Sequence, residues 1–235
     1  MDFLFCAFQK FLKQNSLKKY WNINRKTSQK MTKRLNAKKK ISRKLGASMW
    51  GQVKDPFTKR NSKPGQHGAS QKGRVSDYGI QLRAKQRMKF YYGNISEKQF
   101  FNSFTLASKS KGDVSENFVA LLESRLDAVV YRANFVPTVF AARQFVNHKH
   151  VTVNGKTVNI PSYRVKVGDV VQVREKSRKL AIVMEALQKM ERDVPTYLQL
   201  DKDAYSIKLT AKPTFSEVPY PVEMQPHFIT EFYSR

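Results

Sequence analysis

The sequence predicts an α+β fold: a mostly helical, basic amino-terminal domain, a small domain of two helices and a β-hairpin, and a carboxy-terminal tail that packs back on the helical domain. The main observation is a change in the spacing of apolar residues, which is helical up to about Asn147 and alternates, as in strands, from Val151 onward. An Asn154-Gly155 pair within the alternating part favours a two-residue hairpin turn. With 40% hydrophobic and 12% aromatic residues, the chain can bury a core.

Four segments are expected along the chain: an extension (1–30), the basic helical domain (31–124), the hairpin domain (125–187) and the tail (188–235). In the extension, apolar residues that could share one helical face precede Lys18 and Lys19, as in a mitochondrial presequence. Asp2 and the scarcity of Arg argue against that interpretation. A disordered extension, or an upstream start codon with Met31 as the functional start, is the favoured alternative.

In the helical domain, basic clusters alternate with turn residues before the first long helix, and a short helix is expected around Ser42–Leu45. A longer helix is expected from Tyr78 to Tyr92. Ser96 is a suitable N-cap for a further helix through Lys109, because its hydroxyl can accept a hydrogen bond from the first turn and an apolar stripe follows.

Across the boundary between these two domains, Ser115 is expected to cap a helix that runs to about Arg132, and a second helix is expected from Thr138 to Asn147. Strands are then expected around 151–153, 156–158, 165–167 and 171–173. A helix near 181–192 leads into the tail, which continues with spaced aromatic residues between prolines. The chain from Leu180 onward holds 6 Lys and Arg against 8 Asp and Glu, so we expect the tail to dock on protein through its aromatic residues.

The charge of the chain indicates a polyanionic partner. The net charge is +26, and residues 1–115 hold 27 Lys and Arg against 5 Asp and Glu, with no acidic residue between Phe3 and Lys54. A solvated surface normally mixes the two signs, so a one-sided run of this length favours nucleic acid as the partner. An anionic membrane surface is a weaker alternative, because the apolar residues lie mostly away from the basic runs.

Candidate catalytic and metal-binding groups are few. The sequence has no phosphate-binding Gly-rich loop and no Gly-x-Ser-x-Gly motif. His148 and His150 flank Lys149, and a polar helix end beside phosphate explains them better than a metal pair. Cys6 is the only cysteine, so neither a disulfide nor a cysteine-based zinc site can form within the chain. We therefore expect no enzymatic activity, no cofactor and no metal.

Two groups of residues are predicted to contact RNA, whose phosphates and 2′-hydroxyls suit planar Arg groups and mobile Lys groups. The group in the helical domain comprises Arg34, Lys38, Lys39, Arg43, Lys44, Arg60, Lys63, Gln66, His67, Lys72, Arg74, Arg83, Lys85, Arg87 and Lys89. The group in the hairpin domain comprises Arg143, His148, Lys149, His150, Asn154, Lys156, Ser162, Tyr163, Arg164 and Lys166.

Several motifs resemble a known family. Arg125-Leu126-Asp127-Ala128-Val129-Val130-Tyr131-Arg132, 141–148 and Val153-Asn154-Gly155-Lys156 resemble the S-four RNA-binding domain. Upstream, five further motifs are similar to the amino-terminal domain of bacterial small-subunit ribosomal protein four: Pro64-Gly65-Gln66-His67-Gly68, Ser76-Asp77-Tyr78-Gly79, 82–86, Tyr92-Gly93 and 97–100. The closing Phe232-Tyr233-Ser234-Arg235 is similar to the carboxy terminus of the same family. The resemblance extends from Met31 to Arg235, and Met31-Thr32-Lys33-Arg34-Leu35 is similar to the start of alphaproteobacterial members.

This resemblance implies a structural ribosomal protein. Members bind a multi-helix junction in the 5′ domain of small-subunit rRNA, nucleate assembly of the subunit body, lie beside ribosomal proteins three and five near the mRNA entry channel, and influence decoding accuracy. It favours a ribosome in the bacterial cytoplasm over the alternative of a ribosome in the mitochondrial matrix, with no membrane partner and no homo-oligomer. The chain departs from the pattern in two ways: it lacks the cysteines of zinc-bearing members, and the loop Ala69–Arg74 is less basic than in some relatives, which leaves Lys72 and Arg74 for any mRNA contact.

Two other classes of protein use the same small domain. An RNA-modifying enzyme would need a separate catalytic domain with a conspicuous Asp or a nucleotide-binding motif, and residues 31–115 are too basic and too poor in acids to supply one. A free RNA chaperone of the heat-shock type would leave residues 31–115 unexplained.

Overall fold

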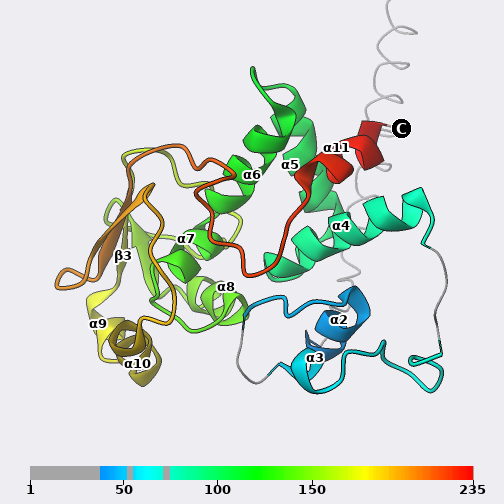
Figure 1. The fold of residues 1–235 in the computed structure, drawn as a ribbon. Helices are drawn as coiled ribbons and strands as arrows, with labels where there is room; N and C mark the ends of the chain where they lie inside the picture. Colours follow the sequence, from blue (N-terminus) through cyan, green and yellow to red (C-terminus); the bar gives the residue numbers. More distant parts are fainter. Residues whose placement is uncertain (1–37, 52–54, 71–74, 235) are drawn as a thin grey trace, which may run out of the picture. The chain divides into compact units, whose positions relative to one another are not determined.

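The computed structural model describes residues 38–51, 55–70 and 75–234, so the expectations for residues 1–30 lie outside it (Figure 1). The first helices are α2 (Lys38–Leu45), α3 (Pro56–Lys59), α4 (Asp77–Tyr91), α5 (Glu97–Ser108) and α6 (Val114–Glu123). They are followed by α7 (Leu126–Arg132), α8 (Val139–Asn147), α9 (Glu175–Arg178), α10 (Ala181–Lys189) and α11 (Pro226–Ser234). A small antiparallel sheet accompanies the later helices, so the predicted α+β class is confirmed.

Side-chain caps fix where the helices begin. The hydroxyls of Ser76 and Ser96 accept hydrogen bonds from the backbone N–H groups of Gly79 and Gln99, so the predicted cap at Ser96 is confirmed. The predicted cap at Ser115 is wrong: Asp113 is the N-cap, its carboxylate accepts from the backbone N–H groups of Ser115 and Glu116, and the helix begins two residues earlier than predicted. A carboxylate at this position also interacts favourably with the positive end of the helix dipole.

The single helix predicted from Ser115 to Arg132 is interrupted between α6 and α7. At the break, Arg125 has an extended backbone and forms an isolated antiparallel bridge with Arg164. The N–H of Leu126 donates to the carbonyl of Tyr163 at 2.8 Å, and the N–H of Val165 donates to the carbonyl of Ser124 at 2.8 Å. These long-range bonds replace helical ones, which is why helical spacing in the sequence did not reveal the break.

The sheet has the order β2-β1-β3-β5-β4, with β1 (Val151–Val153), β2 (Lys156–Thr157), β3 (Val170–Val173), β4 (Leu198–Asp201) and β5 (Ser206–Leu209). The turn at Asn154-Gly155 has the positive φ values, 47° and 78°, that the sequence predicts for a two-residue hairpin. The strand expected at 165–167 does not form, since this segment pairs with the α6–α7 junction instead. The β4–β5 hairpin, which lies in the tail and extends the sheet, was not predicted.

One hydrophobic core runs through the described residues from Ile41 to Ile229. The last helix, α11, packs against α4 and α6, so the tail returns to the helical domain as predicted (Figure 1). The ring of Tyr233 lies 4.9 Å from that of Phe104, between centroids, and Phe232 lies 5.7 Å from Tyr78 in the same way. The aromatic residues at the end of α11 therefore pack on both α4 and α5.

Candidate RNA-binding surface

A loop of the hairpin domain is held rigidly against the start of α7. In addition to the two backbone bonds at the α6–α7 junction, the N–H of Asp127 donates to the carbonyl of Pro161 at 3.2 Å. The buried Arg125 guanidinium pairs with the buried Asp127 carboxylate at 2.8 Å and fixes the helix side of this contact. Val165 is buried below the loop, whereas Tyr163 and Arg164 are exposed. A ring and a cation thus project from a fixed backbone.

At the hairpin tip, the side chain of Asn154 forms two hydrogen bonds within the protein. Its amide donates to Asp169 Oδ1 at 2.8 Å, and its carbonyl oxygen accepts from the N–H of Val170 at 2.9 Å. The second carboxylate oxygen of Asp169 accepts from the N–H of Lys166 at 2.8 Å. We therefore propose that Asn154 serves mainly to shape the turn, and Lys156 and Lys166 are the exposed cations beside it.

The end of α8 carries the two histidines. The His150 ring stacks on Phe145 at 4.8 Å between centroids, and its Nδ1 shares a hydrogen bond with Ser177 Oγ at 2.8 Å. Partial burial, together with the nearby His148 and Arg174, lowers the pKa of His150. No group of three His, Cys, Asp or Glu side chains that could hold a metal occurs in the described ranges.

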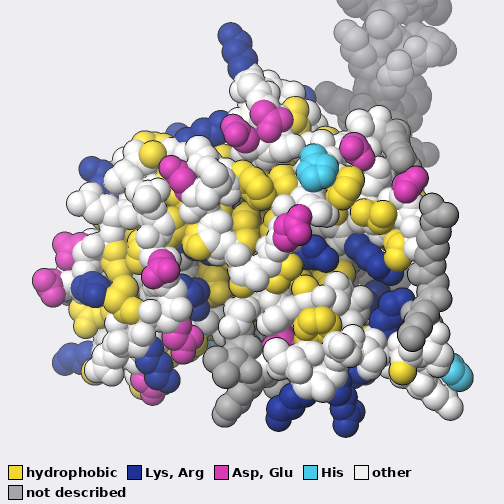
Figure 2. All heavy atoms as spheres, viewed as in Figure 1, with side chains coloured by type: hydrophobic (Ala, Val, Ile, Leu, Met, Phe, Trp, Pro, Cys, Tyr) yellow, Lys and Arg dark blue, Asp and Glu magenta, His cyan; other side chains and the backbone are white. Residues whose placement is uncertain are grey.

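In the helical domain, exposed cations gather over α2 and α3 (Figure 2). Lys44 and Arg60 are exposed there, whereas Arg43 is half-buried. The guanidinium of Arg43 donates to the carbonyls of Ser62 and Lys63 at 3.0 and 3.2 Å and so anchors the following loop on α2. Arg43 is therefore better explained as an anchor of this surface than as a direct RNA contact.

Three residues of α4 that the sequence suggested as RNA contacts have internal partners. Lys85 is buried, with its Nζ 2.8 Å from Glu97 and 4.1 Å from the centre of the Phe232 ring. Lys89 pairs with the same carboxylate at 3.0 Å, and Arg87 donates to the carbonyl of Glu223 at 3.0 Å. Because α11 and the tail cover this side of α4, these cations hold protein segments together, and we propose this internal role for them in place of direct RNA contact.

The predicted residues that the structure describes differ in exposure, and Lys85 is the buried one among them. The exposed ones are Lys44, Arg60, Gln66, His67, Arg83, His148, Lys149, Asn154, Lys156, Tyr163, Arg164 and Lys166. The half-buried ones include Arg43, Lys63, Arg87, Lys89, Arg143, His150 and Ser162. Arg34, Lys72 and Arg74, and the side chains of Lys38 and Lys39, lie outside what the structure describes.

Comparison with known proteins identifies this arrangement. Residues 33–123 match the family described as ribosomal protein S4/S9 N-terminal domain, and residues 124–171 match the S4 domain, the S-four domain of the resemblance above. The small ribosomal subunit protein uS4 of Azorhizobium caulinodans is 58% identical over 205 residues, which is 87% of this chain and 100% of that protein. The uS4 proteins of Phenylobacterium zucineum and Caulobacter vibrioides are 60% and 59% identical over 204 residues, with the same coverage. The chain belongs to the uS4 family. It is a structural constituent of the small ribosomal subunit and not an enzyme.

The structure adds three exposed cations to the candidate surface of this uS4-family chain. Lys40 and Lys59 lie beside the predicted residues of α2 and α3, and continuing the same basic runs by one residue would have found them. Arg174 comes close to the end of α8 only because β3 pairs with β1, and its guanidinium donates to the carbonyl of Lys149 at 3.2 Å. No local pattern in the sequence indicates that contact.

Two surfaces can now be defined for the uS4-family chain. The α2–α3 surface comprises the exposed cations Lys40, Lys44, Lys59 and Arg60. The hairpin surface comprises the exposed residues Lys149, Lys156, Tyr163, Arg164, Lys166 and Arg174. Across the described ranges, no helix has both the length and the apolar content needed to cross a membrane.

Proposed function

We propose that this chain binds the 5′ domain of small-subunit rRNA through the α2–α3 surface and the hairpin surface, and that this binding nucleates assembly of the subunit body. Its neighbours in this proposal are ribosomal proteins three and five of the small subunit and the mRNA near its entry channel, where the chain contributes to translational accuracy. The site of action is the ribosome in a bacterial cytoplasm. The observation that carries the proposal is the set of exposed cations on segments that internal hydrogen bonds hold in place, in a chain of the uS4 family.

The chemistry of the two surfaces suits folded RNA. Phosphate and 2′-hydroxyl contacts dominate recognition of structured RNA, because the deep major groove of an A-form helix does not admit side chains. Arg164 can present a planar fork to phosphate, and Lys149 and Lys156 can follow phosphates as mobile charges. Tyr163 adds an exposed ring that can stack on an unpaired base.

The test is a filter-binding titration of the 5′-domain RNA with the Lys149→Ala, Lys156→Ala, Arg164→Ala triple variant. Each lost phosphate contact should reduce the steepness of the salt dependence by roughly 0.7–0.9 in a log–log plot, so the triple variant should lose about 2 to 3 and bind at least about tenfold more weakly. Lys202→Ala removes an equally exposed lysine between Asp201 and Asp203 and should change neither quantity. An unchanged affinity and slope in the triple variant would contradict the proposed surface.

A further inference from the structure

A buried polar cluster, which we call the hub, consists of Tyr92, Glu123, Arg132, Tyr197 and Tyr220. Arg132 donates twice to the Glu123 carboxylate, at 2.8 and 3.1 Å. The hydroxyls of Tyr92 and Tyr197 donate to the same carboxylate at 2.6 and 3.0 Å. The side chain of Glu123 is fully buried and that of Arg132 is 3% exposed. The carboxylate thus has four donors and no contact with solvent.

The pKa shifts of the hub residues agree with the direction of their hydrogen bonds. Burial alone would raise the pKa of Glu123, but the charge of Arg132 and the hydrogen bonds from Arg132, Tyr92 and Tyr197 hold the pKa below its usual value. Burial and the nearby carboxylate raise the pKa of Tyr92 well above its usual value. Glu123 is therefore ionised and the tyrosine is protonated at neutral pH, which is the arrangement that these hydrogen bonds require.

The hub joins the parts of the chain that carry the two basic surfaces. Tyr92 follows α4 and Glu123 ends α6, both in the helical part, and Trp50, just beyond α2, donates to the carbonyl of Tyr91 at 3.2 Å. Arg132 ends α7, whose first residues hold the loop with Tyr163 and Arg164. One end of α7 therefore contacts the hub, and the other end supports the hairpin surface.

The tail completes the cluster. The third donor of Arg132 reaches the carbonyl of Pro219 at 3.1 Å, and the hydroxyls of Tyr220 and Tyr92 lie 2.6 Å apart. Tyr197, which directly precedes β4, comes from the sheet side. Three separate regions thus meet on one carboxylate and one guanidinium.

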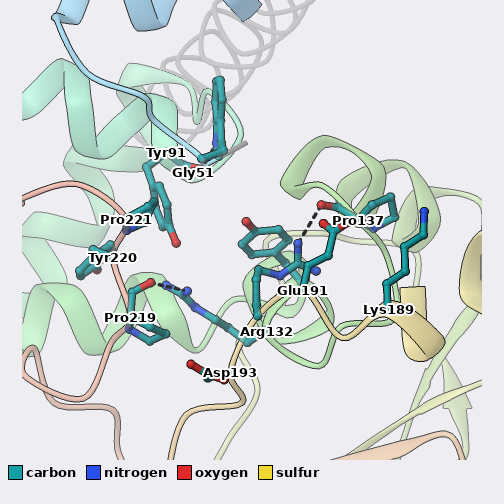
Figure 3. Close-up of a pocket in the computed structure, with 13 residues that line it drawn as sticks. Gly51, Tyr91, Arg132, Pro137, Lys189, Glu191, Asp193, Pro219, Tyr220 and Pro221 are labelled. Atoms are coloured by element: carbon teal, nitrogen blue, oxygen red, sulfur yellow. Dashed lines mark hydrogen bonds between the residues drawn. The ribbon is translucent and has the colours of Figure 1, made fainter. Parts of the chain in front are cut away.

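Beside the hub, a cleft of about 960 Å³ lies between the helical part and the hairpin part (Figure 3). Elsewhere the two parts are in direct contact, for example through the rings of Trp50 and Phe140, whose centroids lie 5.3 Å apart. Gly51 and Tyr91 lie on one side of this cleft, and Pro137 and Lys189 lie on the other, with Arg132 between them. Because apolar packing does not close this side, the directional bonds of the hub are well placed to fix the angle between the helical part and the hairpin part.

A buried ion pair is a poor means of gaining stability, since the loss of hydration offsets most of the attraction and apolar replacements are often as stable. Its bonds are directional, however, and an apolar contact is not. We infer that Glu123 is a positioning residue, which holds the α2–α3 surface and the hairpin surface at one fixed orientation so that both can bind a single folded RNA. This inference rests on the proposed function, because linked sites gain affinity only when both can be occupied together.

The orientation can be measured directly in the full-length chain. With Cys6 replaced by serine, spin labels on Ser108→Cys and Gln188→Cys, both at exposed positions on α5 and α10, report the distance between the two parts by double electron–electron resonance. The parent chain should give one narrow distribution, and Glu123→Gln should broaden or shift it. Asp127→Asn is the matched control, because it breaks a buried ion pair that lies within the hairpin part alone, and its distribution should stay narrow.

Tyr197→Phe provides a second, milder variant that removes one hydroxyl from the hub and leaves the ion pair in place. It should broaden the distribution less than Glu123→Gln does, and it keeps the inference testable if Glu123→Gln does not fold. Narrow, unshifted distributions in the folded hub variants would overturn the inference.

RNA binding separates this inference from the proposed function. Glu123→Gln should bind the complete 5′-domain RNA at least about tenfold more weakly, because it loses part of the gain from two linked contacts. It should bind short RNA helices that reach only one surface as well as the parent chain does. If the parent chain shows no preference for the 5′ domain, the proposed function is wrong. If the parent chain prefers the 5′ domain and Glu123→Gln binds that RNA as tightly as the parent chain does, the positioning role of Glu123 is wrong.

Discussion

Glu97 offers a test of the reassignment of the α4 cations. Its carboxylate pairs with Lys85 and Lys89 and accepts a hydrogen bond from the hydroxyl of Tyr233 at 2.7 Å, so it links α4, α5 and α11. Partial burial alone would raise the pKa of Glu97, but the hydrogen bonds from these three side chains hold the pKa at about 2, against 4.5 ordinarily. Replacing it by Gln keeps the shape of the side chain and removes the charge.

The expected cost follows from that pKa. A difference between 4.5 and about 2 would correspond to about 3 kcal/mol at about 1.36 kcal/mol per pKa unit. The Glu97 side chain is 47% exposed, so solvent screening reduces this contribution to about 1 kcal/mol. Because the pKa is lowered in the folded chain, the contribution is complete above pH 4.5 and is lost as the pH falls from 4.5 toward 2.

The assay is urea unfolding of the parent chain and Glu97→Gln between about pH 7 and pH 3, with Glu185→Gln, an exposed carboxylate of α10, as the control. The difference in the free energy of unfolding should stay at about 1 kcal/mol from neutral pH down to about pH 4.5 and should shrink below that pH. RNA affinity should remain within about twofold, because Lys85 stays covered by the Phe232 ring. A stability difference that is zero at neutral pH, or a rise in RNA affinity as the two lysines are released, would refute the internal role.

Two further predictions concern the core and the hairpin. Phe118 is fully buried and its ring lies 5.0 Å from that of Phe100, between centroids, so Phe118→Ala should lower the free energy of unfolding by about 3–5 kcal/mol. Phe101→Ala, at an exposed position, should lower it by less than about 1 kcal/mol. Urea denaturation of the two variants measures this difference, and equal losses would contradict the assigned core. Asn154→Ala removes the hydrogen bonds to Asp169 and Val170 and leaves an alanine at a φ of 47°. It should therefore lower the free energy of unfolding by about 1–3 kcal/mol, measured by thermal unfolding. An unchanged stability would show that the turn does not depend on this side chain.

Local features of the sequence were sufficient for several elements. The Ser96 cap and the Asn154-Gly155 turn depend on backbone geometry that neighbouring residues determine, so their positions could be predicted. The helix of α8 was predicted for the same reason, because Thr138 caps it and its apolar residues recur at helical spacing. The family motifs added what no spacing could, namely that the small domain and the basic helices belong to one ribosomal protein.

Features that depend on distant partners could not be predicted. The break between α6 and α7 exists because residues 161–165 bond to its backbone, and the sequence around Ser124 keeps helical spacing throughout. The sequence suggests Lys85 as an RNA contact, but in the fold Lys85 is covered by Glu97 and by Phe232, which lies far along the chain. The hub likewise joins residues from Tyr92 to Tyr220 and has no local signature.

The most direct test of the proposed function compares the affinity of the full-length chain for the folded 5′ domain of small-subunit rRNA with its affinity for tRNA, at the same moderate salt concentration. A chain whose exposed cations are arranged for that rRNA should bind the 5′ domain far more tightly, and the affinity should fall steeply as salt is added. Equal affinity for the two RNAs would mean that the basic surfaces provide only general attraction to phosphate, and it would contradict the proposed role in nucleating the small subunit.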